Sequence, residues 1–293
     1  MFPAAFEYVR ASSADEALAA LAQHGADARV LAGGQSLIPA MRYRLARPAV
    51  LVDINPIKEL AYIKESNGFL AIGALTRDFA LEQSALIAKS YNLMSDVSAV
   101  VADPVVRQMG TVVGSLCHND PAGDWGVAAL AARAQILVRG PKGDRAVSID
   151  DYLVDSYTTA LADGEMAIEV RFPTPPARSS AAYFKIERKV GDFATASAAA
   201  AIALAADGTI ASAGIALGAA GPQAVRVAEA EKALIGQKPS RDLIRTAADL
   251  ARKKSDPGAD TRGTVEYKKD MAGVLVGRAL EKTFKRLGVE VSK

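Results

Sequence analysis

The chain has 293 residues, half of them hydrophobic, so it is long enough to fold as a globular protein with two domains. Its 35 basic and 33 acidic residues leave a net charge of +2, and this balance argues against binding to nucleic acid or to an anionic membrane. The single cysteine, Cys117, excludes an internal disulfide and an all-cysteine zinc or iron–sulfur site within the chain, and the two distant histidines, His24 and His118, argue against a histidine-rich metal site.

Neither a secretory signal nor a membrane span is indicated. The first eight residues, Met-Phe-Pro-Ala-Ala-Phe-Glu-Tyr, contain no basic n-region and no apolar h-region. The longest apolar tract, residues 193–206, is too short and too rich in alanine and hydroxyl residues to cross a bilayer. We therefore expect a soluble, cytoplasmic protein.

The first 54 residues have the pattern of a small α/β unit. Ser13-Ala-Asp-Glu16 is a capping box that predicts a short helix, which Gly25 ends. A strand at 29–32, a short basic helix at 41–45 and a second strand at 50–54 follow.

Two adjacent glycines, Gly33 and Gly34, end the first of these strands. Glycine backbone can take positive φ and present successive N–H groups to one side, which is how a loop holds a phosphate without a basic side chain. Gln35 and Ser36 add small polar groups, and Ser36 is expected to cap the turn that starts at Leu37. Taken alone, a Gly-Gly pair after a strand is more often an ordinary tight turn.

Strands at 60–64 and 69–73 flank Asn67-Gly68, a strong hairpin signal. Thr76 is expected to cap a helix, and residues 84–103 are expected to be mostly helical because their apolar residues form a stripe. We interpret that stripe as core.

A second glycine-rich stretch runs from Gly110 to Asp124 and precedes a predicted helix at 125–132. It is not a nucleotide P-loop, because no Gly-Lys-Ser/Thr follows. Asp120 is expected to begin a turn and Asp124 to be the N-cap of the helix. An acid/base pair formed by the two carboxylates is the alternative, although neither has an evident reacting partner nearby in sequence.

The remaining elements divide at a stiff linker, residues 173–180, which contains three prolines. The predicted strands before it lie at 134–139, 145–149 and 166–172. An antiparallel meander at 182–188, 195–205 and 209–216, with Asp207-Gly208 at its second turn, and helices near 224–235, 240–253 and 266–286 are expected after it.

The two glycine-rich loops form a pair that can hold the two phosphates of a dinucleotide from opposite sides. A pyrophosphate bound by backbone N–H groups and helix N-termini needs no cationic side chain, so the absence of lysine and arginine at the loop tips does not count against it. The Rossmann spacing Gly-x-Gly-x-x-Gly does not occur near the first loop, which argues against a doubly wound nicotinamide domain.

These residues resemble a known family. Residues 32–41, with Arg44-Leu45 and 48–54 behind them, look like the first FAD motif of the flavoprotein (medium) subunit of molybdenum hydroxylases, the xanthine dehydrogenase and aerobic carbon monoxide dehydrogenase family. Residues 106–115, followed by Asp120-Pro121 and Asp124, resemble the second FAD motif, about 70 residues further on. The likeness continues through Tyr157 to Leu161, Tyr183 to Arg188 and the C-terminal helical region, so it covers essentially the whole chain.

The resemblance implies an α+β fold. Residues 1–175 would form a bipartite, PCMH-type FAD-binding domain made of two α/β subdomains, at about 1–54 and 55–175. Residues 176–293 would form a smaller C-terminal α+β domain of antiparallel sheet plus helices.

The resemblance also implies site residues. The backbone of residues 32–36 would wrap the pyrophosphate with Leu37 beside the flavin, and Asp124 would accept hydrogen bonds from ribose or ribityl hydroxyls. Leu161 and Lys185 would lie near the isoalloxazine. The full set of predicted FAD contacts is Ala32, Gly33, Gly34, Gln35, Ser36, Leu37, Ala74, Val101, Ala102, Thr111, Gly114, Ser115, Cys117, His118, Asp120, Asp124, Leu161 and Lys185. No catalytic acid or base and no metal ligand is predicted.

One position departs from the family pattern. The family usually has Thr-Ile-Gly-Gly where this chain has Thr111-Val-Val-Gly114, so Val113 occupies a glycine position. Because a β-branched residue is poorly suited to positive φ, we expect an ordinary backbone there. Cys117 is interpreted as a small packed residue. Trp125 either stacks on flavin or adenine or, as we expect, lies in the core.

The function that the resemblance implies is electron transfer through FAD. Partner subunits would hold the other cofactors: two [2Fe–2S] clusters in a small subunit and a molybdopterin cofactor in a large one, in a dimer of heterotrimers. Electrons would leave to an external acceptor, which is NAD, a quinone or oxygen. Two rival hypotheses are a stand-alone FAD oxidase or dehydrogenase and a flavin-free assembly module. Carbon monoxide, aldehydes and nitrogen heterocycles all remain open as substrates.

Overall fold

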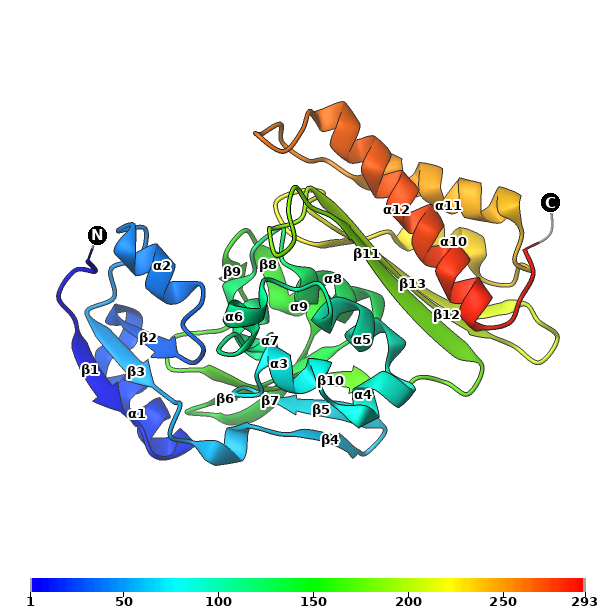
Figure 1. Ribbon diagram of the computed structural model, residues 1–293. Coiled ribbons are helices and arrows are strands. Elements are labelled where there is room, and N and C mark those ends of the chain that lie inside the picture. The colour runs from blue at the N-terminus through cyan, green and yellow to red at the C-terminus, as the bar shows by residue number, and fades with distance from the viewer. Residues whose placement is uncertain (1, 292–293) are drawn as a thin grey trace.

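The computed structural model describes residues 2–291, which form three main sheets with helices packed against them (Figure 1). The fold is α+β, as predicted, and its C-terminal part is an antiparallel sheet with helices packed against it.

The N-terminal lobe is a parallel three-stranded sheet in the order β1-β3-β2. Its elements are β1 (Glu7–Arg10), α1 (Ala14–His24), β2 (Ala28–Leu31), α2 (Leu37–Arg42) and β3 (Val50–Asp53). Ser13 caps α1 by accepting a hydrogen bond from the Glu16 amide (3.2 Å), but the Glu16 carboxylate bonds to Ser12 instead of Ser13. Only half of the predicted capping box is therefore correct.

The middle lobe is an antiparallel sheet in the order β4-β5-β10-β6-β7, with short helices around it. The hairpin prediction is confirmed, because Asn67 and Gly68 both have positive φ between β4 and β5. The strands are β4 (Ile63–Ser66), β5 (Phe69–Gly73), β6 (Gln135–Gly140), β7 (Gly143–Ser148), β10 (Met166–Pro173) and a separate pair, β8 (Leu153–Asp155) and β9 (Thr158–Thr159). The helices are α3 (Asp78–Glu82), α4 (Ala85–Ser90), α5 (Asn92–Ser98), α6 (Pro104–Arg107), α7 (Val112–His118), α8 (Asp124–Ala131) and α9 (Ile149–Tyr152).

Two predictions in this lobe are wrong in detail, and a third is confirmed. Thr76 does not cap a helix, because its hydroxyl pairs with the backbone N–H and C=O of Tyr62 and α3 begins two residues later. The expectation that residues 84–103 are mostly helical is confirmed, with the helical residues divided at Tyr91 into α4 and α5. Asp124 is the first residue of α8 and not its N-cap, which is Gly123.

The C-terminal lobe is an antiparallel sheet in the order β11-β12-β13-β14, and it confirms the predicted meander. Its elements are β11 (Ser179–Ile186), β12 (Ala196–Leu204), β13 (Ile210–Gly218), β14 (Val225–Arg226), α10 (Ala228–Leu234), α11 (Arg241–Lys254) and α12 (Val265–Arg286). Helices α10 and α12 pack on one face, with α11 against them, while α5 and α8 pack on the other (Figure 1). Because β12 is buried on both faces, its run of alanines suits close approach of helices from both sides.

Trp125 lies in the core, as expected, with no exposed surface. Its indole N–H donates to Asp78 Oδ1 (2.9 Å), and Asp78 is itself buried at the start of α3. The interaction joins α3 to α8, beneath the second glycine-rich loop.

Among residues 2–291, no helix is both long and apolar enough to cross a membrane. In the same part of the chain, His, Cys, Asp and Glu side chains do not gather in groups of three or more that could hold a metal ion.

The burial of Asp78 makes the stability of the protein depend on pH. Burial raises the pKa of Asp78 from 3.8 to about 6. The folded state then holds its proton more tightly than the unfolded state, so the free energy of unfolding falls as pH rises from about 4 to about 6. Asp78→Asn keeps an acceptor for Trp125 but cannot ionise. Between pH 4 and pH 7 its unfolding free energy should gain about 2 kcal/mol relative to wild type, as measured by urea unfolding.

Asp207→Asn is the control. Hydrogen bonds from Thr209 lower the pKa of this exposed carboxyl, so its loss should change the pH dependence in the opposite direction. Parallel pH profiles for Asp78→Asn and wild type would contradict the prediction.

Candidate functional site

The first glycine-rich loop joins β2 to α2, and its two glycines serve different purposes. Gly34 has φ +72°, in the left-handed region where L side chains are strained. Gly33 does not lie in that region, but a Cβ on it would stand 2.1 Å from the carbonyl oxygen of Met109. Positive φ is therefore needed at Gly34, and close approach of another segment requires glycine at Gly33.

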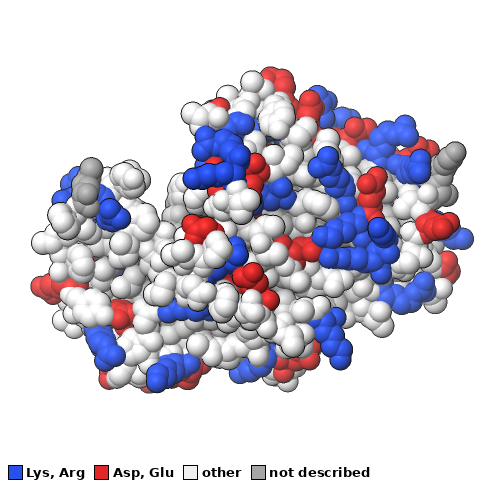
Figure 2. Space-filling view, viewed as in Figure 1, with Lys and Arg blue, Asp and Glu red and all other residues white. Residues whose placement is uncertain are grey.

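The backbone amides of residues 32–36 donate no hydrogen bond to any protein acceptor within residues 2–291. The predicted cap by Ser36 is wrong, because its side chain bonds to no amide of α2. Beside these amides is a groove of about 400 Å³. It is lined by Leu31, Ala32, Gly33, Gly34, Gln35, Ile38, Pro39, Arg42, Asn55 and Met109. Figure 2 shows the surface hollowed between the N-terminal lobe and the rest of the molecule.

The second loop starts at Gly110, directly after Met109, whose carbonyl group the first loop contacts. Gly110 accepts a hydrogen bond from the Asp78 amide (2.9 Å), and the Thr111 hydroxyl caps α7 by accepting from the Gly114 amide (3.0 Å). Val113 is buried in α7 with helical backbone, so the expectation of an ordinary conformation there is confirmed.

Asp124 and Lys185 form a buried ion pair between α8 and β11. Lys185 Nζ lies 3.1 Å from Asp124 Oδ2 and also donates to the carbonyl oxygen of Val100 (2.9 Å). The Tyr183 hydroxyl donates to Asp124 Oδ1. Burial raises the pKa of Asp124, and the neighbouring ammonium of Lys185 opposes that rise. The predicted contacts Asp124 and Lys185 therefore lie together, although they are 61 residues apart in sequence.

Asp120 has partners of its own. Its carboxylate accepts from the Ala122 amide (2.9 Å), which confirms the predicted turn, and lies 3.4 Å from the Tyr157 hydroxyl and 3.9 Å from His118 Nε2. Burial lowers the pKa of His118, while Asp120 opposes the shift. Because each carboxylate is engaged separately, the geometry gives no support to an acid/base pair of Asp120 and Asp124.

The other predicted contacts lie in the middle lobe. Val101 and Ala102 present their carbonyl oxygens to the Arg107 guanidinium at 3.0 and 3.1 Å, and Ala102 has positive φ. Cys117 lies 3.1 Å from the Tyr152 hydroxyl, and burial raises its thiol pKa to about 11, as befits a packed residue. Ala74 is buried and Leu161 packs against the larger core cluster.

Sequence reasoning missed Asn55 and Met109 as groove residues. Asn55 precedes Pro56, in a pair that is typical of a turn, and Met109 has no local signal because its contact with Gly33 spans 76 positions.

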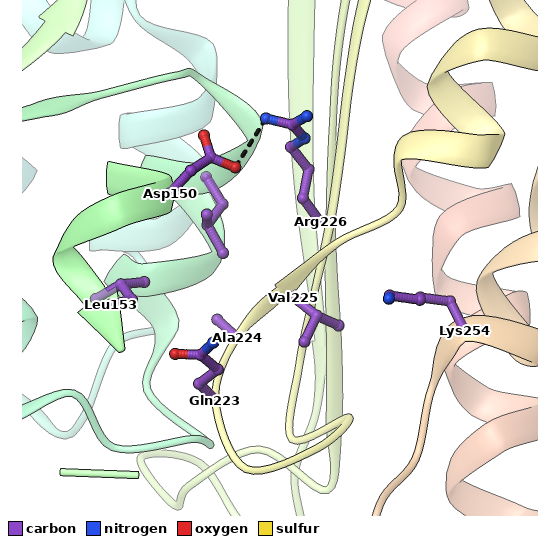
Figure 3. Close-up of a pocket in the computed structure, with 8 residues that line it drawn as sticks. Asp150, Leu153, Gln223, Ala224, Val225, Arg226 and Lys254 are labelled. Atoms are coloured by element: carbon purple, nitrogen blue, oxygen red, sulfur yellow. Dashed lines mark hydrogen bonds and ion pairs between the residues drawn. The ribbon is translucent and has the colours of Figure 1, made fainter. Parts of the chain in front are cut away.

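A second hollow, of about 180 Å³, lies between the middle and C-terminal lobes (Figure 3). Arg226 reaches across from β14 and bonds to Asp150 of α9 at 2.7 Å. The hollow is lined by Leu130, Asp150, Leu153, Gln223, Ala224, Val225, Arg226 and Lys254, none of which is a predicted FAD contact. We interpret it as part of the contact between the lobes.

The residues at the first loop suit a pyrophosphate. Five successive amides without protein acceptors, in a turn with positive φ, form the kind of concavity that binds anions. The apolar side chains of Leu31, Ile38 and Pro39 suit the uncharged parts of a dinucleotide in the same groove.

Comparison with known proteins agrees with this geometry. Residues 4–175 match the FAD binding domain in molybdopterin dehydrogenase, and residues 181–283 match the CO dehydrogenase flavoprotein C-terminal domain. The chain is 37% identical to the carbon monoxide dehydrogenase medium chain of Hydrogenophaga pseudoflava, over 98% of this chain and 99% of that protein. It is also 37% identical to the 6-hydroxypseudooxynicotine dehydrogenase complex subunit alpha of Paenarthrobacter nicotinovorans, over 98% and 97% of the two chains.

Among solved structures, carbon monoxide dehydrogenase from Hydrogenophaga pseudoflava, in a form lacking the Mo-pyranopterin moiety, superposes with a TM-score of 0.94 at 39% identity, covering 98% of this chain and 99% of the other. These matches extend over both domains and agree in fold, sequence and length. The chain therefore belongs to the family of FAD-binding medium subunits of molybdenum hydroxylases.

Proposed function

We propose that this chain holds FAD in the groove between its two glycine-rich loops and passes electrons from partner iron–sulfur clusters to an external acceptor, which is NAD, a quinone or oxygen. The observation that supports the site best is the row of five backbone amides, residues 32–36, without protein acceptors at that groove. Bound FAD would supply the redox chemistry, while the protein binds and orients it.

Different residues of the chain would contact different parts of FAD. The amides of 32–36 bind the pyrophosphate, and Leu37 lies beside the flavin. Thr111, Gly114, Ser115 and His118 line the opposite side. The other proposed contacts are Ala74, Val101, Ala102, Cys117, Asp120 and Leu161.

Asp124 would accept hydrogen bonds from ribose or ribityl hydroxyls. Each of its oxygens already accepts one protein hydrogen bond, from Tyr183 or Lys185. A carboxylate oxygen has two lone-pair sites, so each can accept one more bond. Burial raises the pKa of Asp124, while the Lys185 ammonium opposes that rise and its hydrogen bond holds the carboxylate in place. We propose that Lys185 lies near the isoalloxazine.

We place the domain boundary between residues 175 and 176, with the subdomain boundary near residue 54. The segment between Pro173, which ends β10, and Ser179, which starts β11, has no regular structure. It contains Pro175 and Pro176, which stiffen a linker.

The partners follow from the relatives. One relative is a medium chain and another is a subunit of a dehydrogenase complex. With one cysteine, this chain cannot supply the ligands of an iron–sulfur cluster alone. We propose a small subunit with two [2Fe–2S] clusters and a large molybdopterin subunit, assembled as a dimer of heterotrimers in the cytoplasm.

Native purification tests this function against its rivals. The proposed relay predicts a flavin spectrum together with iron–sulfur and molybdenum subunits. Flavin with autonomous turnover and no partners would support a stand-alone oxidase or dehydrogenase instead. A purified chain without flavin would support an assembly module and contradict the FAD site.

Gly34→Val tests the first loop. A β-branched side chain at φ +72° is strained, and its Cβ would stand 3.1 Å from Ile38 Cγ1 and 3.2 Å from Leu31 Cδ1. The amides should leave the geometry that faces the groove, and FAD should bind about tenfold more weakly or worse, as measured by titrating the flavin-free chain.

Gly208→Val is the matched control. Gly208 also has positive φ, at +85°, but lies in the β12–β13 turn with no atom within 4 Å of its Cβ position. This variant introduces backbone strain of the same kind but leaves the first glycine-rich loop unaltered, so its affinity for FAD should match that of wild type. Equal FAD affinity in Gly34→Val and Gly208→Val would show that the first loop does not hold the cofactor.

A further inference from the structure

The two glycine-rich loops belong to different lobes, so something must fix their spacing. The first loop follows β2 of the N-terminal lobe, and the second precedes α7 of the middle lobe. They meet where Gly33 contacts the carbonyl group of Met109. That contact sets how close the loops come, but a van der Waals contact does not hold them together.

A chain of side-chain hydrogen bonds spans the same gap. Asn55 Nδ2 donates to the carbonyl oxygen of Ala32 (2.9 Å), at the start of the first loop. Arg77 Nη2 donates to Asn55 Oδ1 (2.5 Å), and Arg77 Nη1 donates to the carbonyl oxygen of Met109 (2.7 Å). The Arg77 guanidinium thus connects Asn55, which bonds to the first loop, with Met109, which directly precedes the second loop.

Both ends of this chain are anchored. On the N-terminal side, Asp53 Oδ1 accepts from Asn55 N (2.9 Å) and Asn55 Nδ2 (2.6 Å), while the Tyr8 hydroxyl donates to Asp53 Oδ2. On the other side, the Asp78 amide, next to Arg77 in sequence, donates to the carbonyl oxygen of Gly110 (2.9 Å).

The geometry requires arginine. Its planar fork presents several N–H donors in fixed directions, so it can bind two acceptors on two lobes at once. Lysine has a single ammonium on a flexible stem and matches such a pair poorly. Arg77 is partly buried, and burial lowers the pKa of its guanidinium, while the charges of Asp53 and Asp78 oppose that shift.

We propose that Arg77 is a positioning residue, which holds Asn55 and the Met109 carbonyl group so that both glycine-rich loops face one FAD groove. The inference rests on the proposed FAD site. Arg77 itself need not touch the cofactor.

The test measures FAD dissociation constants for the full chain by titration of flavin-free protein. Arg77→Ala and Asn55→Ala should each weaken binding by about tenfold. Arg77→Lys retains the charge but reaches only one acceptor, so its FAD dissociation constant should lie between those of Arg77→Ala and wild type. If Arg77→Ala does not fold, Arg77→Lys provides the measurement. Because the residues act in one chain of bonds, the double variant should bind no more weakly than either single variant.

Arg178→Ala is the matched control. Arg178 also donates to two backbone carbonyl groups, those of Ala205 (2.6 Å) and Ala206 (3.0 Å), but in the C-terminal lobe. Its affinity for FAD should equal that of wild type.

Each other outcome has a distinct meaning. If wild type binds FAD and Arg77→Ala binds it equally well, the inference is overturned while the FAD site stands. Additive losses in the double variant would also overturn it, since they would indicate two independent effects. A wild-type chain that binds no FAD would overturn the proposed function and this inference with it.

Discussion

The contact between Gly33 and the Met109 carbonyl group is the constraint on which the site depends. A Cβ at residue 33 would stand 2.1 Å from that oxygen, a separation that atoms do not adopt. Only glycine lets the N-terminal lobe approach the middle lobe this closely. The groove lies where the two lobes meet, and its lining includes residues 32–35, whose backbone amides donate to no protein acceptor within residues 2–291.

The C-terminal lobe is tied to the same region by buried charge. Lys185 extends from β11 to Asp124 at the start of α8 and to the Val100 carbonyl oxygen in the middle lobe. A buried ion pair is weak evidence for stability, because removing both charges from water is costly. What the pair does is join β11 directly to the start of α8. The predicted FAD contacts of the two domains are thereby held in one arrangement.

Much of the fold was predictable because local signals were strong. Asn67-Gly68 and Asp207-Gly208 indicated hairpin turns, and long stretches of apolar periodicity predicted helices α11 and α12. Helix α7 was missed because Val-Val-Gly has poor helix propensity and is stabilised here by burial and by the Thr111 cap. Strand β1 was missed because its residues are mostly exposed and its pairing with β3, which lies about 40 residues further on, leaves no local pattern.

The site was predictable only in part, because contacts between residues far apart in the sequence determine it. The glycines at 33 and 34 stand out in the sequence, but what requires Gly33 is a carbonyl group 76 residues away. Likewise Ser36 and Asp124 were assigned capping roles that are typical of their residue types, whereas the Ser36 side chain caps no amide and Asp124 bonds to Tyr183 and Lys185 across the fold. Long-range contacts of this kind leave no local pattern.

Hydrogen–deuterium exchange of the full chain, with and without added FAD, tests the central claim most directly. The amides of residues 32–36 have no protein acceptors and should exchange quickly in the flavin-free chain. FAD should slow their exchange together with that of residues 110–115, while exchange in the 205–209 turn should stay unchanged. Bound FAD with unchanged exchange at residues 32–36 would contradict the account.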